Sequence, residues 1–315
     1  MKTYRTEAAL PVMAGDLLMQ PLIHTGEWQA MDTSASDAHA THELEDVTFT
    51  MHVPRSRIGL INAIRPDLPW ADEHFDERVS GIPHNPPPSA VRWPYAVRGN
   101  ADHVRCPTCG SRQPSMHPAV SGGGEVTSRC PDAFHNGQSG TFDHTYPERF
   151  WPKHAGIQRA LVADGSNWGI RFQYGDLSDV VRLLVRSPLT RQAYLPVWFP
   201  EDTGAVARQR VPCTLGYHFM IRDDRLSCRY YIRSCDMRRH FVNDVYFAGR
   251  LMQWMCDAFN DMRAINGQSP GELTPGRLVM HITSLHCFVG DHEAIRERFI
   301  KPWTYREASQ DGIPR

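Results

Sequence analysis

Residues 212–236 read PCTLGYHFMIRDDRLSCRYYIRSCD and contain two runs in which apolar residues alternate with other residues. The alternating apolar positions are Leu215, Tyr217, Phe219 and Ile221, and then Leu226, Cys228, Tyr230 and Ile232. A period of two is typical of strands that are buried on one face, and Asp223-Asp224 between the runs suits a tight turn. The segment therefore predicts a β-hairpin.

Helical patterns flank this hairpin on both sides. We expect a short helix over Asp67–Gly81, ended by the proline-rich run Pro83–Pro88, and a helix over Asp176–Arg186. Arg191–Trp198 has strand character, and Asp244–Met262 carries the apolar stripe of a long buried helix. Helices packed on a mixed sheet favour the α+β class, with layers like those of α/β proteins, over a helical bundle.

Composition excludes several classes of protein. The 315 residues include 34 basic and 35 acidic side chains, so bulk charge attracts the chain neither to nucleic acid nor to a membrane. We find no apolar stretch of about 20 residues and no signal peptide at Met1–Arg5, and expect a cytoplasmic protein. The eight cysteines are then expected to be reduced thiols, metal ligands or a nucleophile rather than disulfides.

Two segments stand apart in composition. Residues 1–45 show no sustained period and are interpreted as an N-terminal extension, with the catalytic domain over 46–315. Residues 101–141 are rich in Cys, His, Gly and Ser and are interpreted as an inserted loop.

This insert contains the pattern of a zinc knuckle, in which two cysteines are separated by two residues and followed by glycine. The predicted ligands of a structural zinc ion are Cys106, Cys109, Cys130 and His135, with His103 and His117 in reserve. The alternative is a flexible insert whose side chains bind no metal.

Reactive side chains lie at the two ends of the hairpin. Cys213 follows a proline, where rigid backbone can aim a thiol, although a buried core cysteine is the alternative. Arg233 and Ser234 could hold a phosphate through a guanidinium fork and a hydroxyl; the alternative is a solvated arginine at a strand end.

The joint order of these features resembles the thymidylate synthase superfamily and, within it, the pyrimidine-nucleotide hydroxymethylases of bacteriophages and nucleoside-antibiotic pathways. The matching motifs are Pro212-Cys213, Arg233-Ser234-Cys235-Asp236 and Asn243-Asp244, together with 187–191 (SPLTR) and 284–288 (SLHCF). The likeness covers most of the C-terminal two thirds of the chain, while the N-terminal third of the chain matches the superfamily only loosely. It implies the thymidylate synthase fold, with a large mixed sheet that forms the interface of a homodimer.

The resemblance also assigns roles. Cys213 is the expected nucleophile at carbon 6 of a pyrimidine, after which carbon 5 takes a one-carbon unit from 5,10-methylenetetrahydrofolate. Arg233 and Ser234 are expected to bind the 5′-phosphate, and Arg191 the phosphate of the neighbouring subunit. A second arginine of the family is Gln192 here, so either the phosphate is bound more weakly or another basic residue takes its place.

Further assignments concern the folate, the sugar of the nucleotide, and the water molecule that would add to give a hydroxymethyl group. Asp236, Trp93 and Tyr146 are expected on the folate side, and His286 on the sugar; for Trp93 and Tyr146 the alternative is aromatic core. The family's sugar-binding tyrosine is replaced by Phe288, which favours a ribonucleotide. Glu77 is the expected catalytic glutamate, with Glu73 as the next choice, and both have a solvated helix face as the alternative.

Asp244 is predicted to read the base. Thymidylate synthases carry asparagine there, whereas an ionised carboxylate only accepts hydrogen bonds and suits the exocyclic amine and a protonated ring nitrogen of cytosine. Thr214 after the nucleophile also resembles the deoxycytidylate hydroxymethylases. The alternatives are that Asn243 fills this role through a one-residue shift, or that Asp244 only caps a helix.

These assignments lead to one functional hypothesis and two alternatives. The hypothesis is 5-hydroxymethylation of CMP, or of dCMP, with folate as one-carbon donor and no membrane partner. The first alternative is a dUMP methylase or hydroxymethylase of the same superfamily. The second is an inactive relative whose insert binds nucleic acid through Arg98, Arg105, Arg112 and Arg129, although no aromatic stacking platform accompanies them.

Overall fold

The computed structural model of the chain describes residues 2–23, 40–85, 87–92, 144–155, 175–203, 211–268 and 272–301. Its strands are β1 (Lys2–Arg5), β2 (Leu22–Ile23), β3 (Thr41–His52), β4 (Tyr194–Pro196), β5 (Thr214–Arg222), β6 (Arg225–Asp236) and β7 (Thr274–Phe288). They form one seven-stranded mixed sheet in the order β1-β3-β7-β6-β5-β4, with β2 paired to β3.

Helices and short turns complete the described fold. The α-helices are α1 (Leu10–Leu18), α2 (Arg57–Ile64), α3 (Trp70–Val79), α5 (Tyr146–Phe150), α6 (Leu177–Arg186), α7 (Phe241–Ile265) and α8 (His292–Ile295). The tighter turns are η1 (Glu7–Ala9), η3 (Pro88–Arg92), η4 (Pro200–Asp202) and η5 (Val289–Asp291), and η6 (Arg296–Ile300) is a π-helical turn. This arrangement confirms the α+β class. In the part of the chain that is described, no helix is long and apolar enough to cross a membrane.

The predicted hairpin is confirmed. β5 and β6 pair antiparallel from Thr214–Ile232 to Arg222–Arg225, and both residues of the Asp223-Asp224 turn have positive φ, 50° and 53°. Aspartate tolerates this left-handed conformation better than most residues, which allows a two-residue loop whose twist matches the strands. β6 then pairs parallel with β7, so that Asp236 lies beside His286 at one end of the sheet.

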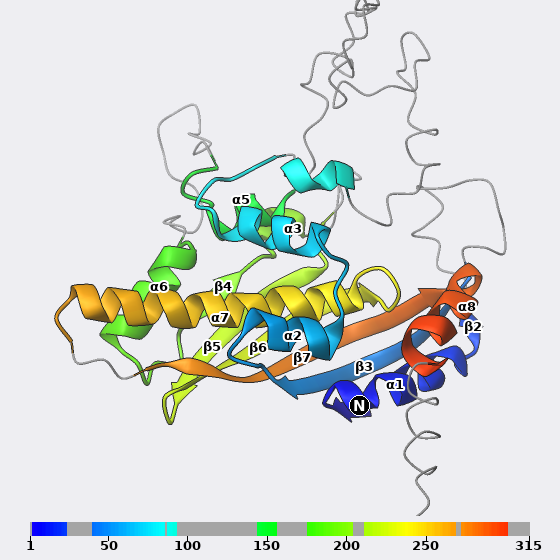
Figure 1. Cartoon of the computed structure of the whole chain (residues 1–315). Helices are drawn as coiled ribbons and strands as arrows, with labels where there is room; N and C mark the ends of the chain where they lie inside the picture. The colour runs from blue at the N-terminus through cyan, green and yellow to red at the C-terminus, as the bar shows by residue number, and fades with distance from the viewer. Residues whose placement is uncertain are drawn as a thin grey trace, which may run out of the picture.

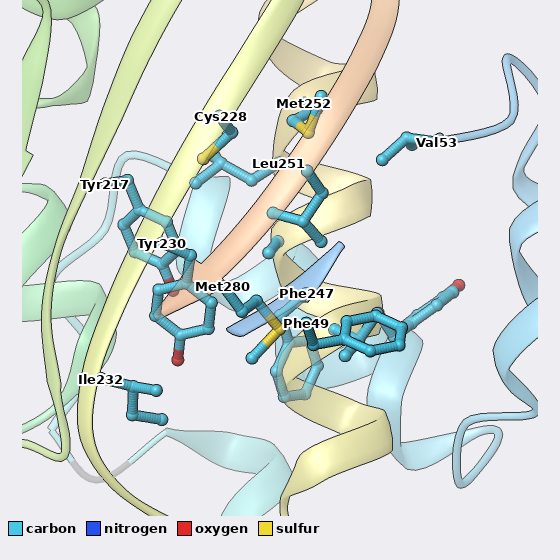
Figure 2. Close-up of a cluster of buried hydrophobic side chains, with 14 of the residues drawn as sticks. Phe49, Val53, Tyr217, Cys228, Tyr230, Ile232, Phe247, Leu251, Met252 and Met280 are labelled. Atoms are coloured by element: carbon cyan, nitrogen blue, oxygen red, sulfur yellow. The ribbon is translucent and has the colours of Figure 1, made fainter. Parts of the chain in front are cut away.

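The core lies between the sheet and α7, which packs against β6 and β7, while α2, α3 and α6 pack against α7 (Figure 1). The 25-residue helix buries one side almost completely, including Phe241, whose ring meets Phe49 of β3 edge-on at 5.3 Å. Figure 2 shows part of this core, with side chains from the sheet and from α7, and in it Tyr217 and Tyr230 lie side by side near Met280. Burial on this scale supplies most of the stabilisation of the fold.

Three predicted elements are confirmed with shifted ends. α3 and α6 fall within the segments expected to be helical, and the Asp176 side chain caps α6 by accepting from the backbone N–H of Asp179. α7 begins at Phe241 rather than at Asp244. This difference places Asp244 inside the first turn of the helix instead of before it.

The N-terminal segment contains two elements that the sequence pattern did not predict. β1 pairs with β3, and α1 buries Met13 and Leu17 completely in the core. Four strand residues and a nine-residue helix are too short to show a sustained hydrophobic period, which is why the sequence pattern missed them. Residues 24–39 lie outside the described residues.

Gly216 is required where β4 approaches β5. A Cβ atom there would clash with the ring of Tyr194 and lie 2.7 Å from the carbonyl oxygen of Leu195. We expect Gly216→Ala to lower the free energy of unfolding by about 1–3 kcal/mol, because backbone must move to relieve the overlap. Gly15→Ala is the matched control, since nothing lies within 4 Å of its Cβ. The control should stabilise α1 by about 0.5–1 kcal/mol, and equal effects in urea denaturation would contradict the packing argument.

Candidate active site

The loop that carries Cys213 is fixed by Arg233. The Arg233 guanidinium donates to the carbonyl oxygens of Pro212 (2.9 Å) and Val211 (3.2 Å), and its backbone N–H donates to the carbonyl oxygen of Cys213 (2.9 Å). The Cys213 thiol is half-buried immediately before β5. The backbone around the predicted nucleophile is therefore held by three hydrogen bonds from one residue of the neighbouring strand.

Two tyrosines meet at the hydroxyl of Thr214, the residue after this thiol. Thr214 is completely buried, and its Oγ1 lies 3.0 Å from the Tyr146 hydroxyl and 2.8 Å from that of Tyr230. Tyr217 stacks on Tyr230 at 4.6 Å (Figure 2). The sequence pattern gave Tyr217 and Tyr230 only as strand core, because alternation records burial and not where a hydroxyl points.

Asp244 is a buried acid on the first turn of α7. It is 8% exposed, and its Oδ2 accepts from the thiol of Cys235 at 3.6 Å. Burial raises the pKa of Asp244 to about 7, although the nearby cation of Arg78 acts to lower it. The helix N-cap is His240, so the alternative in which Asp244 only caps the helix does not hold.

Asn243, the other candidate for reading the base, is engaged elsewhere. Its amide nitrogen donates to Asp67 (2.8 Å) and to the carbonyl oxygen of Arg239 (3.2 Å), and its amide oxygen accepts from the backbone N–H of Asp67 (3.1 Å). Asn243 is itself 1% exposed. These contacts tie α7 to the segment before α3, and they favour Asp244 as the side chain left to face a base.

Arg78 is the residue of this site that sequence reasoning missed. It is 4% exposed, and its guanidinium carbon lies 3.9 Å from the centre of the Tyr146 ring and 4.1 Å from that of Phe247. A single arginine at the end of a short polar helix gives no signal in sequence, because such residues are usually solvated. Only the three-dimensional arrangement places it between two aromatic rings.

Asp236 is the centre of an ionic cluster at the end of β6. Its Oδ1 accepts from the backbone N–H groups of Arg238 (2.9 Å) and Arg239 (3.0 Å), and its Oδ2 accepts from the Arg239 guanidinium (2.7 Å). Burial acts to raise the pKa of Asp236, but Arg239 and neighbouring imidazoles hold it below its ordinary value. Asp291 forms ion pairs with both arginines, and the lowered pKa keeps the Asp236 carboxyl ionised near neutral pH.

Glu77 lies in a contact with Ser89 that its sequence position did not predict. Its two oxygens accept from the backbone N–H and the hydroxyl of Ser89, each at 2.6 Å, and the imidazole of His74 lies 2.9 Å from the same hydroxyl. Burial lowers the pKa of His74 to about 4, so the ring is neutral at pH 7. Glu73, the second choice, is paired with Arg92 at the surface.

The remaining predicted residues are distributed as follows. Ser234 is half-buried on β6 opposite Ser284, His286 is buried beside Asp236, and Arg191 is exposed before β4. Trp93, Cys106, Cys109, Cys130 and His135 lie outside the described residues. Within the described residues, no group of three or more His, Cys, Asp or Glu side chains could hold a metal ion.

The arrangement joins a thiol and an acid through a compact polar cluster. Tyr146 interacts electrostatically with both Cys213 and Asp244, and burial together with these two groups raises its pKa. A half-buried thiol near a buried acid with a pKa of about 7 can add to a conjugated ring while the acid gives a proton to it. The cluster has the components of nucleophilic addition with general acid catalysis.

The Thr214 bridge provides a test of this cluster. We expect Thr214→Val to lower the free energy of unfolding by about 1–3 kcal/mol, because the two buried tyrosine hydroxyls lose their shared partner without a change in shape. Thr214→Ser keeps the hydroxyl and should cost less. Chemical denaturation of both variants measures the difference, and equal losses for the two would show that the methyl group, not the hydroxyl, matters at this position.

Comparison with known proteins identifies the family to which the chain is similar. Residues 138–301 match the family model described as thymidylate synthase. The chain is also similar to a thymidylate synthase of Rhodopseudomonas palustris (strain BisA53), with 25% identity over 142 residues. That alignment covers 45% of this chain and 41% of the relative, so the chain spans about two fifths of the relative's length.

Proposed function

Because the chain belongs to the thymidylate synthase family, we propose that it transfers a one-carbon unit to carbon 5 of a pyrimidine nucleotide. The proposed nucleotide is CMP or dCMP, and the proposed product is its 5-hydroxymethyl derivative. The observation that carries the choice of base is the buried Asp244 carboxyl, with a pKa of about 7, next to an Asn243 whose amide oxygen and nitrogen already have hydrogen-bond partners.

The proton of Asp244 explains this choice. Cytosine offers an amine, which donates, and an unprotonated ring nitrogen N3, which accepts, so it needs one proton held between N3 and the facing carboxyl. A carboxyl with a pKa of about 7 can supply that proton near neutral pH. Uracil instead offers O4, which accepts, and N3–H, which donates, so the protonated carboxyl could bond it as well. Only the ionised carboxylate, which predominates above pH 7, would oppose two acceptors at O4, at a cost of about 1–3 kcal/mol.

The same proton serves the proposed addition step. The Cys213 thiolate bonds to carbon 6, the electrons of the C5–C6 double bond form a C4–C5 double bond, and the C4–N3 pair moves to N3. N3 takes the proton of Asp244 at that moment, which leaves carbon 5 as an enamine carbon able to attack an electrophile. The half-buried thiol, fixed through Arg233, supports this assignment.

Asp236 supports the proposed folate site. An ionised carboxylate has about four acceptor positions, and three of these are used by the N–H groups of Arg238 and Arg239. The remaining position on Oδ2 fits an N–H group of a pterin ring. 5,10-Methylenetetrahydrofolate would supply the one-carbon unit there, and Tyr146 would line the same side together with Trp93.

Water addition then gives the hydroxymethyl group. We assign Glu77 to this step together with His74, because the two share the hydroxyl of Ser89 and the imidazole is neutral. The neutral imidazole and the hydroxyl of Ser89 would fix the Glu77 carboxylate, which would orient the water. Glu73 is a poorer choice, since Arg92 already neutralises it.

The proposed phosphate and sugar contacts use residues at the same end of the sheet. Arg233 and Ser234 would bind the 5′-phosphate, with His286 at the sugar and Phe288 unable to bond a sugar hydroxyl. We propose CMP before dCMP on this ground. Arg191 would reach the phosphate of a neighbouring subunit in a homodimer, and its exposure supports this role.

The zinc knuckle remains a proposal from spacing alone. Its four cysteine and histidine ligands, at positions 106, 109, 130 and 135, would hold a structural zinc ion. Incubating the protein with CMP, dCMP or dUMP and methylenetetrahydrofolate, with product masses measured, tests the whole proposal. Turnover of dUMP alone would favour the uridylate enzyme of the same family instead.

Exchanging Asp244 for asparagine should reverse the choice of base. An amide donates to O4 and accepts from the N3–H of uracil, so Asp244→Asn should change the ratio of kcat/KM for CMP over UMP by about tenfold or more toward UMP. Asp257→Asn on the exposed side of α7 is the matched control and should leave the ratio unchanged. An unchanged ratio in Asp244→Asn would contradict the assignment.

CMP binding should also depend on pH. One proton must lie between Asp244 and N3, and above the pKa of about 7 the free carboxyl has lost it. Above pH 7 we therefore expect the Kd for CMP to rise by about tenfold per pH unit, with uptake of about one proton. Calorimetry in two buffers of different ionisation enthalpy measures this uptake, which Asp244→Asn should abolish.

A further inference from the structure

Arg78 is a buried cation without a buried counter-charge in contact. Its side chain is 4% exposed, and its Nε makes no hydrogen bond to any residue that the structure describes. The guanidinium forms no ion pair with a carboxylate within the described ranges either. Burying a cation in this way is costly, so such groups usually bind a partner or serve a function.

Two aromatic rings hold this cation in place. Tyr146 and Phe247 lie 3.9 and 4.1 Å from the guanidinium carbon, and their faces attract the charge but offer no hydrogen-bond acceptor there. Tyr146 bonds Thr214 beside the nucleophile, and Phe247 lies one helical turn after Asp244 on α7. The rings therefore fix the cation between the thiol side and the acid side of the site.

The cation lies near enough to Asp244 to influence it without pairing with it. Arg78 acts to lower the pKa of Asp244, and that of Tyr146, against the effect of burial. Arg78 and Asp244 do not form an ion pair. A cation at this range stabilises the carboxylate relative to the acid and does not block its contact with a ligand.

We propose that Arg78 is a positioning residue that stabilises the negative charge which Asp244 acquires when it gives its proton to the pyrimidine. This inference rests on the proposed function, since it concerns the addition of Cys213 to carbon 6. In that step the proton leaves the Asp244 carboxyl for N3 as the S–C6 bond forms, and the carboxylate left behind is buried. A fixed cation lowers the activation barrier most when negative charge develops close to it in a site of low dielectric.

Other groups near Asp244 do not supply this charge. Those that interact electrostatically with it are Arg78 of α3, Tyr146 of α5, Tyr217 of β5, and Tyr230, Cys235 and Asp236 of β6. Asp236 acts in the opposite direction and raises the pKa of Asp244. Arg78 is thus the cation of this set.

Exchange of the hydrogen at carbon 5 of CMP tests the proposal without folate. In D2O, addition of Cys213 makes carbon 5 an enamine carbon that takes deuterium, loses its hydrogen and returns CMP when the thiolate leaves. We expect Arg78→Met and Arg78→Gln to slow this exchange by about tenfold to a hundredfold, with the Kd for CMP below pH 7 changed less than threefold. Proton NMR of CMP measures the rate, and thermal unfolding checks the fold.

Two further variants separate charge from packing. Arg78→Lys keeps a cation and should retain exchange within about fivefold of the parent, whereas a loss as large as that of the neutral variants would overturn the proposal. Arg182→Met, at an exposed position on α6, is the control for loss of a surface arginine and should exchange as the parent does. If the neutral variants do not fold, a loss of exchange in folded Arg78→Lys still overturns the proposal.

The pH profile provides the readout that a structural role would not affect. Without Arg78 the pKa of Asp244 rises, so the pH above which CMP binding takes up a proton should move upward in Arg78→Met by about one unit or more. An unchanged midpoint in a folded variant overturns the inference. If the parent itself catalyses no exchange on CMP, the proposed function fails first, whereas exchange that is indifferent to Arg78 leaves that function intact and removes only this inference.

Discussion

The burial of one carboxyl group under the first turn of α7 is the constraint on which the site depends. Asp244 is held against Cys235 at the end of β6, and the parallel pairing of β6 with β7 places that strand end beside His286. Burial raises the pKa of Asp244 to about 7, where a carboxyl can both hold and release a proton near neutrality. By removing water from this one side chain, the fold raises the pKa of an aspartate from its ordinary value to near neutrality.

Much of this arrangement could be predicted from sequence. The hairpin, the long helix and the order of Cys213, Arg233 and Asp244 follow from alternation, helical periodicity and the resemblance to a family. These signals are strong because they repeat over many residues or recur together. The base-reading role itself stays a prediction, although the contacts of Asn243 remove one alternative and the N-cap at His240 removes another.

What the sequence could not predict depends on single contacts between distant segments. Arg78, Tyr146 and Phe247 come from α3, α5 and α7, and no local pattern records that an arginine on a polar helix lies between two rings. The N-terminal strand and helix were missed for a related reason, since short elements acquire their structure from β3 and the core. Glu77 was noticed, but its bonds to Ser89 depend on η3, which proline-rich sequence does not specify.

A buried cation beside a buried acid destabilises the fold unless other interactions offset the cost of removing both charges from water. Two aromatic faces offset part of the cost of Arg78, yet an apolar side chain of the same shape would pack between Tyr146 and Phe247 without any desolvation penalty. The same holds for Asp244, which a leucine could replace on a helix that is otherwise apolar on this side. Two unfavourable choices that lie close together, and close to the half-buried thiol of Cys213, are better explained by chemistry than by stability.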